Sequence, residues 1–296
     1  MKTIVCTGVC VVLVLLCLAH SGAVWSEDLQ QRVEGKKIRV FLLAGQSNME
    51  GRADGRKLSE EDRQRLAKAR ERVQLAYNHE PIAPLHVTKP HPDIERLYQR
   101  DRIFGPELFF GIALSEAWPE ERILLIKRAE GATSLYGCWN PEWSQENATL
   151  MGEGEEPKLY EDFIHYIKQV LSAYKENEYE ICGMLWVQGE SDSRIEEAAS
   201  QYGENLRNLI NHLRKDLNNP TLPFMLFQVG QGEVVKGMKH AAKEIAKVTL
   251  LPQSKKKDSA DFYTKMENGH YDSEGMKKLG NRFADVFLKE YAHYPE

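Results

Sequence analysis

Four short apolar runs are separated along the chain by longer stretches of mixed character. Each run is continuous rather than alternating, which is typical of a strand covered on both faces of a parallel sheet. The runs are Ile38–Ala44, Ile123–Ile126, Cys182–Val187 and Phe224–Val229. We predict a buried strand at each of them.

Helical periodicity fills the intervals. Apolar residues recur every three or four positions over Leu159–Leu171 and again from Tyr202 to Leu217. Another helix is predicted to begin at Pro106, because the first helical position needs no N–H donor. A last helix follows Asp272 and runs through Phe287.

This alternation predicts one α/β domain over residues 37–296, built as a three-layer α/β/α sandwich around a mostly parallel sheet. The segment Gly51–Arg102 is charged and irregular, and we expect a helix in it from Glu60 to Arg72. Ligands of open parallel sheets bind at the carboxyl ends of the strands. We expect this segment to pass over that working edge.

The N-terminus has the pattern of a secretory signal over residues 1–23. Lys2 precedes an apolar stretch from Ile4 to Ala19, and small residues then allow cleavage after Ala23. An uncleaved anchor is the alternative, but the stretch is shorter than the ~20 residues that a spanning helix needs. Residues 24–36 form a polar lead. We expect a secreted protein, extracellular or periplasmic, that makes no membrane contact after cleavage.

The charge balance argues against one class of partner. The formal net charge is −5 and the pI is near 6.0, so the chain lacks the basic character of a nucleic-acid-binding protein. We expect no nucleic-acid partner, and the oligomeric state stays open.

Two cysteines remain after the signal, Cys138 and Cys182. An oxidising compartment would allow them to pair. Their expected positions are at opposite ends of the sheet, beyond the ~7 Å Cα separation that a disulfide spans, so we expect free and mostly buried thiols. Asn147 begins the only glycosylation sequon, in a predicted polar loop, and its modification stays open.

Small and amide-bearing residues follow the predicted strands, and one of them is Ser47 in the sequence GQSN. A serine nucleophile needs a base within hydrogen-bond reach, an acid to orient that base, and donors for the oxyanion. His270, just before the last helix, is the candidate base. Glu267, three residues earlier, could meet the far nitrogen of its ring.

Four motifs in order resemble one family. They are GQSNM, FGPE (Phe104–Glu107), WVQGESD (Trp186–Asp192) and a late acid-x-x-His. The chain resembles the sialate O-acetylesterase-like group of SGNH hydrolases, which includes carbohydrate esterase family six, over about residues 38–287. The resemblance implies an SGNH-type, flavodoxin-like sandwich that needs no metal and no cofactor.

The resemblance also implies residue roles. Ser47 would be the nucleophile and His270 its base, and the oxyanion would be held by the backbone N–H groups of Ser47 and Gly105 and the side-chain amide of Gln188. The third triad member is open between two acids. Relatives usually carry Asp where this chain has Glu267, and some are thought to use the glutamate of QGE, here Glu190. Ala132 is a further departure, because relatives often have a second glycine there.

The resemblance implies a carbohydrate O-acetylesterase of the acetylxylan or sialate type, acting on an acetylated polysaccharide or glycan through an acetyl-enzyme on Ser47. The alternatives are a catalytically inactive carbohydrate-binding relative and, less favoured, a lipase-like hydrolase.

An aromatic cluster could stack on a sugar or simply pack in the loop. Its members are Tyr136, Trp139 and Trp143.

Two other kinds of site are disfavoured. Glu190 and Asp192 lie two residues apart on one loop, which does not suit the flanking acids of a glycosidase. Three histidines could suggest a metal site, but their spacing matches no zinc pattern. They are His79, His86 and His91.

Overall fold

The central sheet has seven strands in the order β4-β3-β6-β1-β7-β8-β9. Neighbours pair in parallel except β4, which runs antiparallel to β3. The strands are β1 (Ile38–Gly45), β3 (Val73–Tyr77), β4 (Ala83–Pro84), β6 (Ile123–Ala129), β7 (Tyr179–Val187), β8 (Phe224–Phe227) and β9 (Val248–Leu251). A separate pair joins β2 (Ala53–Asp54) to β5 (Ile103–Phe104).

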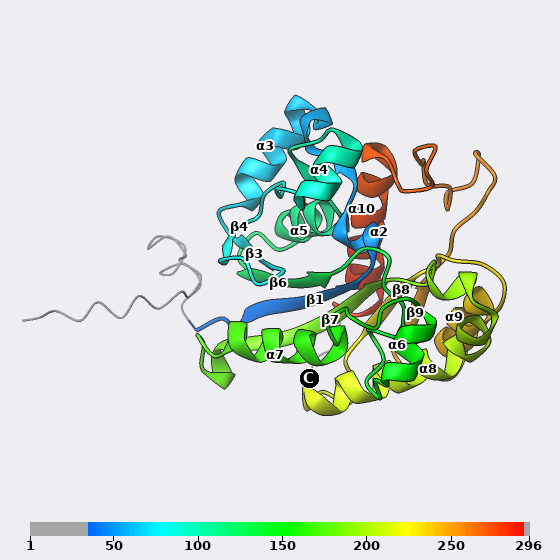
Figure 1. Cartoon of the computed structure of the whole chain (residues 1–296). Coiled ribbons are helices and arrows are strands. Elements are labelled where there is room, and N and C mark those ends of the chain that lie inside the picture. The colour runs from blue at the N-terminus through cyan, green and yellow to red at the C-terminus, as the bar shows by residue number, and fades with distance from the viewer. Residues whose placement is uncertain (1–34, 293–296) are drawn as a thin grey trace, which may run out of the picture.

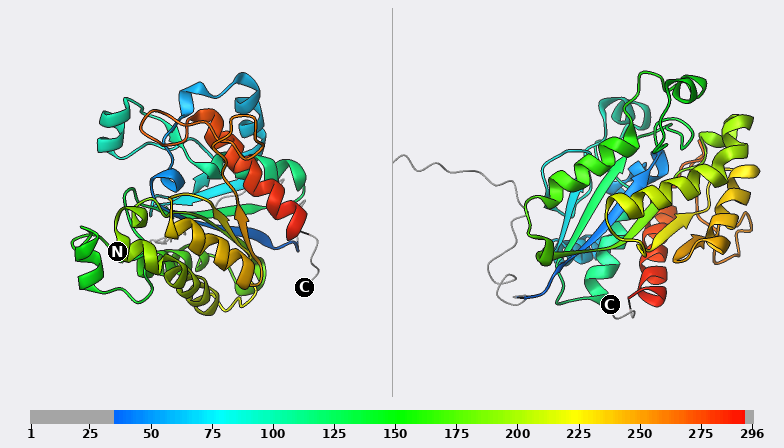
Figure 2. Two further views of the ribbon diagram at one scale, coloured as in Figure 1. Left: turned by 90° about the vertical axis from the view of Figure 1, so that its right-hand side faces the viewer. Right: turned by 90° about the horizontal axis from the view of Figure 1, so that it is seen from below.

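Helices cover both faces of this sheet in the computed structural model, which describes residues 35–292 (Figures 1 and 2). One layer holds α3 (Glu60–Ala69), α5 (Pro106–Ala117) and α10 (Ser273–Glu290), and the other holds α7 (Leu159–Leu171), α8 (Glu196–Asp216) and α9 (Glu233–Glu244). Shorter helices are α2 (Ser47–Glu50), α4 (Pro92–Tyr98), α6 (Gln145–Leu150), η1 (Gly55–Lys57), η2 (Glu176–Glu178) and η3 (Asp192–Arg194). The predicted three-layer α/β/α sandwich is confirmed.

The three central strands end at one level. In the register of the sheet, Gly45 of β1 lies opposite Ala129 of β6 and Val187 of β7. Gly45 has φ +150°, and a Cβ there would lie 2.1 Å from the Val187 carbonyl oxygen, so no larger residue fits. The segments GQSN (residues 45–48), EGATS (130–134) and QGESD (188–192) therefore start side by side at the carboxyl edge.

The segment Gly51–Arg102 is more ordered than its sequence indicates. The expected helix is present as α3, and its N-cap Ser59 accepts a hydrogen bond from the Asp62 amide. The prediction of an otherwise irregular segment is wrong, because Val73–Tyr77 forms β3 and pairs with β6. β9 and α9 were also not predicted, and half of β9 is only partly buried.

Three smaller predictions concern the cysteines, the glycosylation sequon and the N-terminal segment. Cys138 and Cys182 are free and buried, as expected. Asn147 lies in helix α6, so its placement in a loop was wrong. No helix within residues 35–292 has the length and apolar character to cross a membrane. The signal segment, cleavage after Ala23 and hence secretion lie outside the described residues and stay predictions.

Candidate active site

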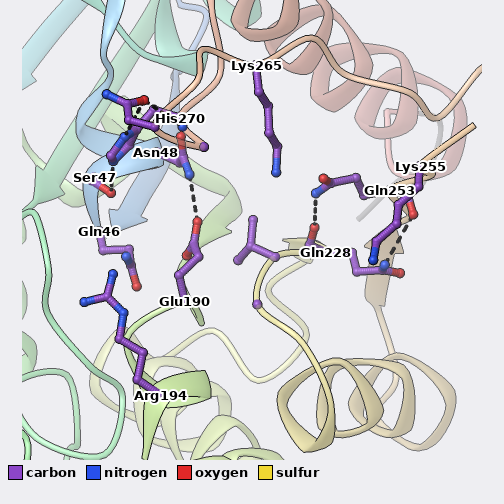
Figure 3. A pocket seen from close by; sticks show the side chains of 14 residues that line it. Gln46, Ser47, Asn48, Glu190, Arg194, Gln228, Gln253, Lys255, Lys265 and His270 are labelled. Carbon is purple, nitrogen blue, oxygen red and sulfur yellow. Dashed lines mark hydrogen bonds between the residues drawn. The ribbon is translucent and has the colours of Figure 1, made fainter. Parts of the chain in front are cut away.

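Ser47 and His270 meet at the carboxyl edge of the sheet. Ser47 is the first residue of α2, separated from the end of β1 by Gln46, and His270 lies in the loop that precedes α10. The Ser47 Oγ is 3.0 Å from the His270 Nε2, which is hydrogen-bond distance (Figure 3). Both residues line a cavity of about 260 Å³ and also a second one of about 410 Å³. The predicted nucleophile and base are thus brought together.

Neither predicted acid contacts His270 within the described part of the chain. Its Nδ1 instead lies 3.1 Å from the Tyr98 hydroxyl and 3.3 Å from the Asn268 Oδ1. Glu267 is exposed and makes no hydrogen bond or ion pair there. Backbone bonds from Met266 N–H to the His270 carbonyl and from Gly269 N–H to the Met266 carbonyl close a tight turn, and Glu267 lies at its tip.

Glu190 supports the site indirectly, through Asn48. Its Oε1 accepts a hydrogen bond of 2.7 Å from the Asn48 Nδ2, and the Asn48 Oδ1 accepts one of 3.3 Å from the backbone N–H of Tyr271. The second oxygen, Oε2, is buried without a partner among the described residues. Burial raises the pKa of Glu190, and the bond from Asn48 partly offsets that rise. Glu190 thereby helps to fix the backbone beside His270.

The structure does not bring the two predicted oxyanion donors Gly105 and Gln188 to the cavity. The Gly105 N–H donates to the Glu107 Oε1 at 2.9 Å. Gln188 is fully buried, and its Nε2 donates to Asp192 at 2.6 Å and to the Thr133 carbonyl at 3.1 Å. Because these N–H groups already have acceptors inside the protein, the predicted donor role does not fit either residue.

Gly131 is a residue beside Ser47 that the sequence did not mark. It lines the larger cavity, and a Cβ placed on it would lie 3.8 Å from the Ser47 Cβ. The next residue, Ala132, is exposed and has φ +64°, in the left-handed region that glycine adopts most readily. That conformation explains why a glycine suits this position, and it shows that alanine is accommodated.

Buried acids hold the loops beneath the cavity. Asp192 accepts hydrogen bonds from the Leu135 and Tyr136 amides at 3.0 and 2.9 Å, in addition to the one from Gln188. Burial raises its pKa to about 6, against the opposing effect of these hydrogen bonds. Glu153, which the sequence did not mark, accepts from the Ser134 amide at 2.6 Å. Asp192 is thus committed to the fold, which removes the basis for a glycosidase interpretation.

Basic side chains surround the base. Arg194, Lys255 and Lys265 line the smaller cavity, and Figure 3 shows Arg194 and Lys265 reaching toward it from opposite sides. Neither of those two forms an ion pair within residues 35–292. Burial lowers the pKa of His270 to about 4, and the positive charges of Arg52, Lys265 and Arg194 add to the effect. His270 is therefore neutral over most of the pH range.

Two of the three rings of the aromatic cluster, those of Tyr136 and Trp139, pack inside the protein, and Trp143 is partly buried. Trp139 is fully buried, with ring centroids 5.3 Å from Trp186 and 6.0 Å from Phe163, and Tyr136 is 4% exposed. These two rings cannot present a face to a sugar, so the packing alternative holds for them. Trp143 is covered by the Lys158 ammonium at 4.4 Å from its centroid.

The three histidines that the sequence analysis considered as a metal site each contact a different partner. His79 pairs with Asp162 at 3.1 Å, the His86 Nδ1 lies 2.9 Å from the Pro84 carbonyl, and His91 caps α4.

The chain is similar to carbohydrate esterases in both sequence and fold. The chain is 25% identical over 260 residues to a protein of Arabidopsis thaliana named as a probable carbohydrate esterase, covering 86% of this chain and 91% of that one. Its crystal structure has a TM-score of 0.63 to this fold at 22% identity, covering 86% of this chain and 99% of that one.

Two further structures share the fold. One is a carbohydrate acetylesterase from Xanthomonas citri, with a TM-score of 0.58, 15% identity, and coverage of 86% of this chain and 57% of that one. The other is NanS, with a TM-score of 0.59, 16% identity, and coverage of 86% and 97%. Residues 37–289 match the family described as carbohydrate esterase, sialic acid-specific acetylesterase, and the chain belongs to that family.

Proposed function

We propose that the protein hydrolyses O-acetyl esters of carbohydrates with Ser47 as nucleophile and His270 as general base. The single observation that carries this proposal is the 3.0 Å contact between the Ser47 Oγ and the His270 Nε2 at the floor of an open cavity. A serine hydroxyl becomes a useful nucleophile when an adjacent imidazole can take its proton. An inactive carbohydrate-binding relative would not require this contact.

The reaction follows from the positions of these two side chains. Ser47 attacks the acetyl carbonyl while its proton passes to the His270 Nε2. The tetrahedral oxyanion accepts hydrogen bonds from the backbone N–H groups of Ser47 and Gly131, for which the described part of the chain offers no other acceptor. His270 then protonates the departing sugar oxygen. Water, activated by the same imidazole, releases acetate and restores Ser47.

The charge of the cavity favours an acidic sugar over a neutral one. Arg194 and Lys265 form no ion pair within residues 35–292, and the buried Glu190 acts on both only at longer range. A substrate carboxylate would supply a direct partner for them. The family description, which names sialic acid, supports the same direction. We therefore place O-acetylated sialic acids ahead of acetylated xylan, and the signal-like N-terminus fits action on extracellular glycans.

The function is tested by measuring acetate released from O-acetylated sialoglycans, acetylated xylan and a neutral aryl acetate. We expect the protein to release acetate from each of these substrates that fits the cavity, with the highest kcat/KM for the O-acetylated sialoglycan. Failure of the full-length protein to release acetate from any of them would contradict the esterase proposal and favour the binding alternative.

Arg194→Gln should lower kcat/KM for the acidic glycan by about 10- to 100-fold, because a hydrogen bond between two charged groups contributes about 1.5–3 kcal/mol. The loss for the neutral aryl acetate should be much smaller. Lys236→Gln, which removes an exposed cation paired with Glu233, serves as the control and should change neither rate. Equal losses of Arg194→Gln on both substrates would contradict the acidic-sugar preference.

The activity should persist to unusually low pH. The base must be neutral, and the pKa of His270 is lowered to about 4, so kcat/KM should fall only below about pH 4 rather than near the ordinary value of 6.5. In Lys265→Met, the loss of a nearby cation should raise the pKa of His270 and so move the acidic fall of kcat/KM to higher pH. A wild-type limb near pH 6.5 in a pH–rate profile would contradict the prediction.

The same shift has a consequence for stability. The folded protein binds the His270 proton less readily than the unfolded chain does. The contribution of His270 to the free energy of unfolding is therefore lost as the pH falls from about 6.5 to about 4. Urea unfolding at several pH values would measure that loss.

A further inference from the structure

We propose that the Tyr98 hydroxyl is the positioning group for His270, at the ring nitrogen where a serine hydrolase ordinarily has a carboxylate. This inference rests on the proposed roles of Ser47 and His270. It adds to Ser47 and His270 a third residue, which comes from the segment 51–102, where the sequence analysis favoured no functional side chain.

The role of Tyr98 follows from the tautomer of His270 that the reaction needs. His270 can take the proton of Ser47 only if its Nε2 carries the lone pair, so the ring hydrogen must be on Nδ1. That N–H has two acceptors, the Tyr98 Oη at 3.1 Å and the Asn268 Oδ1 at 3.3 Å. Asn268 is exposed, and the same oxygen already lies 3.3 Å from the His270 backbone N–H. Tyr98 is therefore the better-placed acceptor.

Tyr98 is itself held in place. It is the last residue of α4, and its ring meets the His270 ring edge-on, with centroids 5.9 Å apart at 86°. The guanidinium groups of Arg52 and Arg100 lie 5.8 and 5.7 Å from its ring centroid. Arg100 also hydrogen-bonds to the Met266 sulfur at 3.1 Å and to the Arg52 carbonyl, which links the end of α4 to the loop of His270.

No carboxylate competes for this position among residues 35–292. Glu190 reaches only the backbone N–H of Tyr271, through Asn48, and Glu267 is exposed. The charged groups whose fields reach His270 are cations, namely Arg52, Lys265 and Arg194. A neutral phenol oxygen can select the tautomer and the ring orientation, but it supplies no counter-charge for the imidazolium. The role of Tyr98 is thus orientation, which predicts a moderate loss of rate when the hydroxyl is removed.

Tyr98→Phe in the full-length protein tests the inference, because it removes only the oxygen. We expect kcat for 4-nitrophenyl acetate to fall about 10- to 100-fold, as when other hydrogen bonds that orient a functional imidazole are lost, with KM changed less than about twofold. ¹⁵N NMR of the His270 ring should show the hydrogen on Nδ1 in the wild type and a mixture of tautomers in the variant. A purely structural role would leave the tautomer unchanged.

Arg96→Gln is the matched control, because Arg96 is an exposed residue of the same helix whose single ion pair among residues 35–292 is with Asp93. It should keep the wild-type kcat. Glu267→Gln and Glu190→Gln are the comparison variants. Unchanged kcat in Tyr98→Phe, or a larger loss with a tautomer change in either glutamate variant, would overturn the proposal.

The NMR measurement keeps this test separate from the proposed function, because it needs no turnover. If Ser47→Ala retained activity, the nucleophile assignment would fail while the tautomer shift in Tyr98→Phe could still be observed. If Tyr98→Phe failed to fold, the wild-type spectrum alone would decide, since a ring hydrogen on Nε2 overturns the proposal.

Discussion

Ser47→Ala should reduce turnover of an aryl acetate by at least about 1,000-fold, because loss of the nucleophile in a serine hydrolase leaves only binding and oxyanion contributions. The fold should survive. Among the residues that the structure describes, the Ser47 hydroxyl makes one hydrogen bond, to His270, and such a bond contributes about 1 kcal/mol. Steady-state kinetics and urea unfolding of the same preparation measure both quantities.

Ser191→Ala is the matched control for this change. Ser191 is also buried and lies on the neighbouring QGESD loop, but its Oγ has no hydrogen-bond partner within the described residues. Full activity is expected, because the hydrogen bonds of Ser191 are made by its backbone. Its N–H donates to the Gln46 side chain at 3.2 Å, and its carbonyl accepts from the Arg194 N–H at 3.2 Å. Near wild-type turnover by Ser47→Ala would remove the basis of the proposed mechanism.

The fold was predictable because its central strands are continuous apolar runs. β1, β6, β7 and β8 are buried on both faces, so their sequences contain the whole signal. β3 escaped prediction because it is only five residues long, contains Gln74 and follows a charged helix. β9 escaped because it has only four residues, VTLL, of which the middle two are only partly buried.

The site was predictable to the extent that it lies next to a strand or precedes a helix. Ser47 lies two residues after the end of β1 and His270 precedes α10, and the sequence marked both positions. Tyr98 could not be found in this way. It reaches His270 across 172 positions of sequence, from a helix in which, among the described residues, no side chain is buried. Contacts of that kind depend on how the segments pack, which no local pattern records.

The motif residues Gly105 and Gln188 show a second limit. Their positions in the chain resemble those of oxyanion donors, yet their N–H groups face inward, to Glu107 and to Asp192. A residue type and a position do not determine where a donor points. That direction is set by which buried acceptors need a partner, because an unpaired buried carboxylate is costly.

Glu107→Gln should lower the free energy of unfolding by about 3–5 kcal/mol, since it leaves a buried charge without its partner. Glu107 on α5 and Lys127 on β6 are both fully buried, and the Lys127 Nζ lies 2.6 Å from the Glu107 Oε2. Burial lowers the pKa of Lys127, and its attraction to Glu107 opposes that effect. Without the glutamate the lysine can relieve the penalty only by losing its proton. The loss measured by urea unfolding should therefore be smaller at pH 9 than at pH 7.

The same substitution at Glu116, on the same helix, isolates the effect of burial. Glu116 pairs with Arg65 at 2.8 Å, but their side chains are 48% and 27% exposed, so Glu116→Gln should cost no more than about 1 kcal/mol. Equal losses in the two variants would contradict the importance of burial at Glu107. A large loss confined to Glu107→Gln would instead assign the FGPE motif to stability. Its glutamate then ties α5 to the sheet and, through the Lys127 contact with the Glu50 carbonyl at 3.0 Å, to the short helix that begins with Ser47.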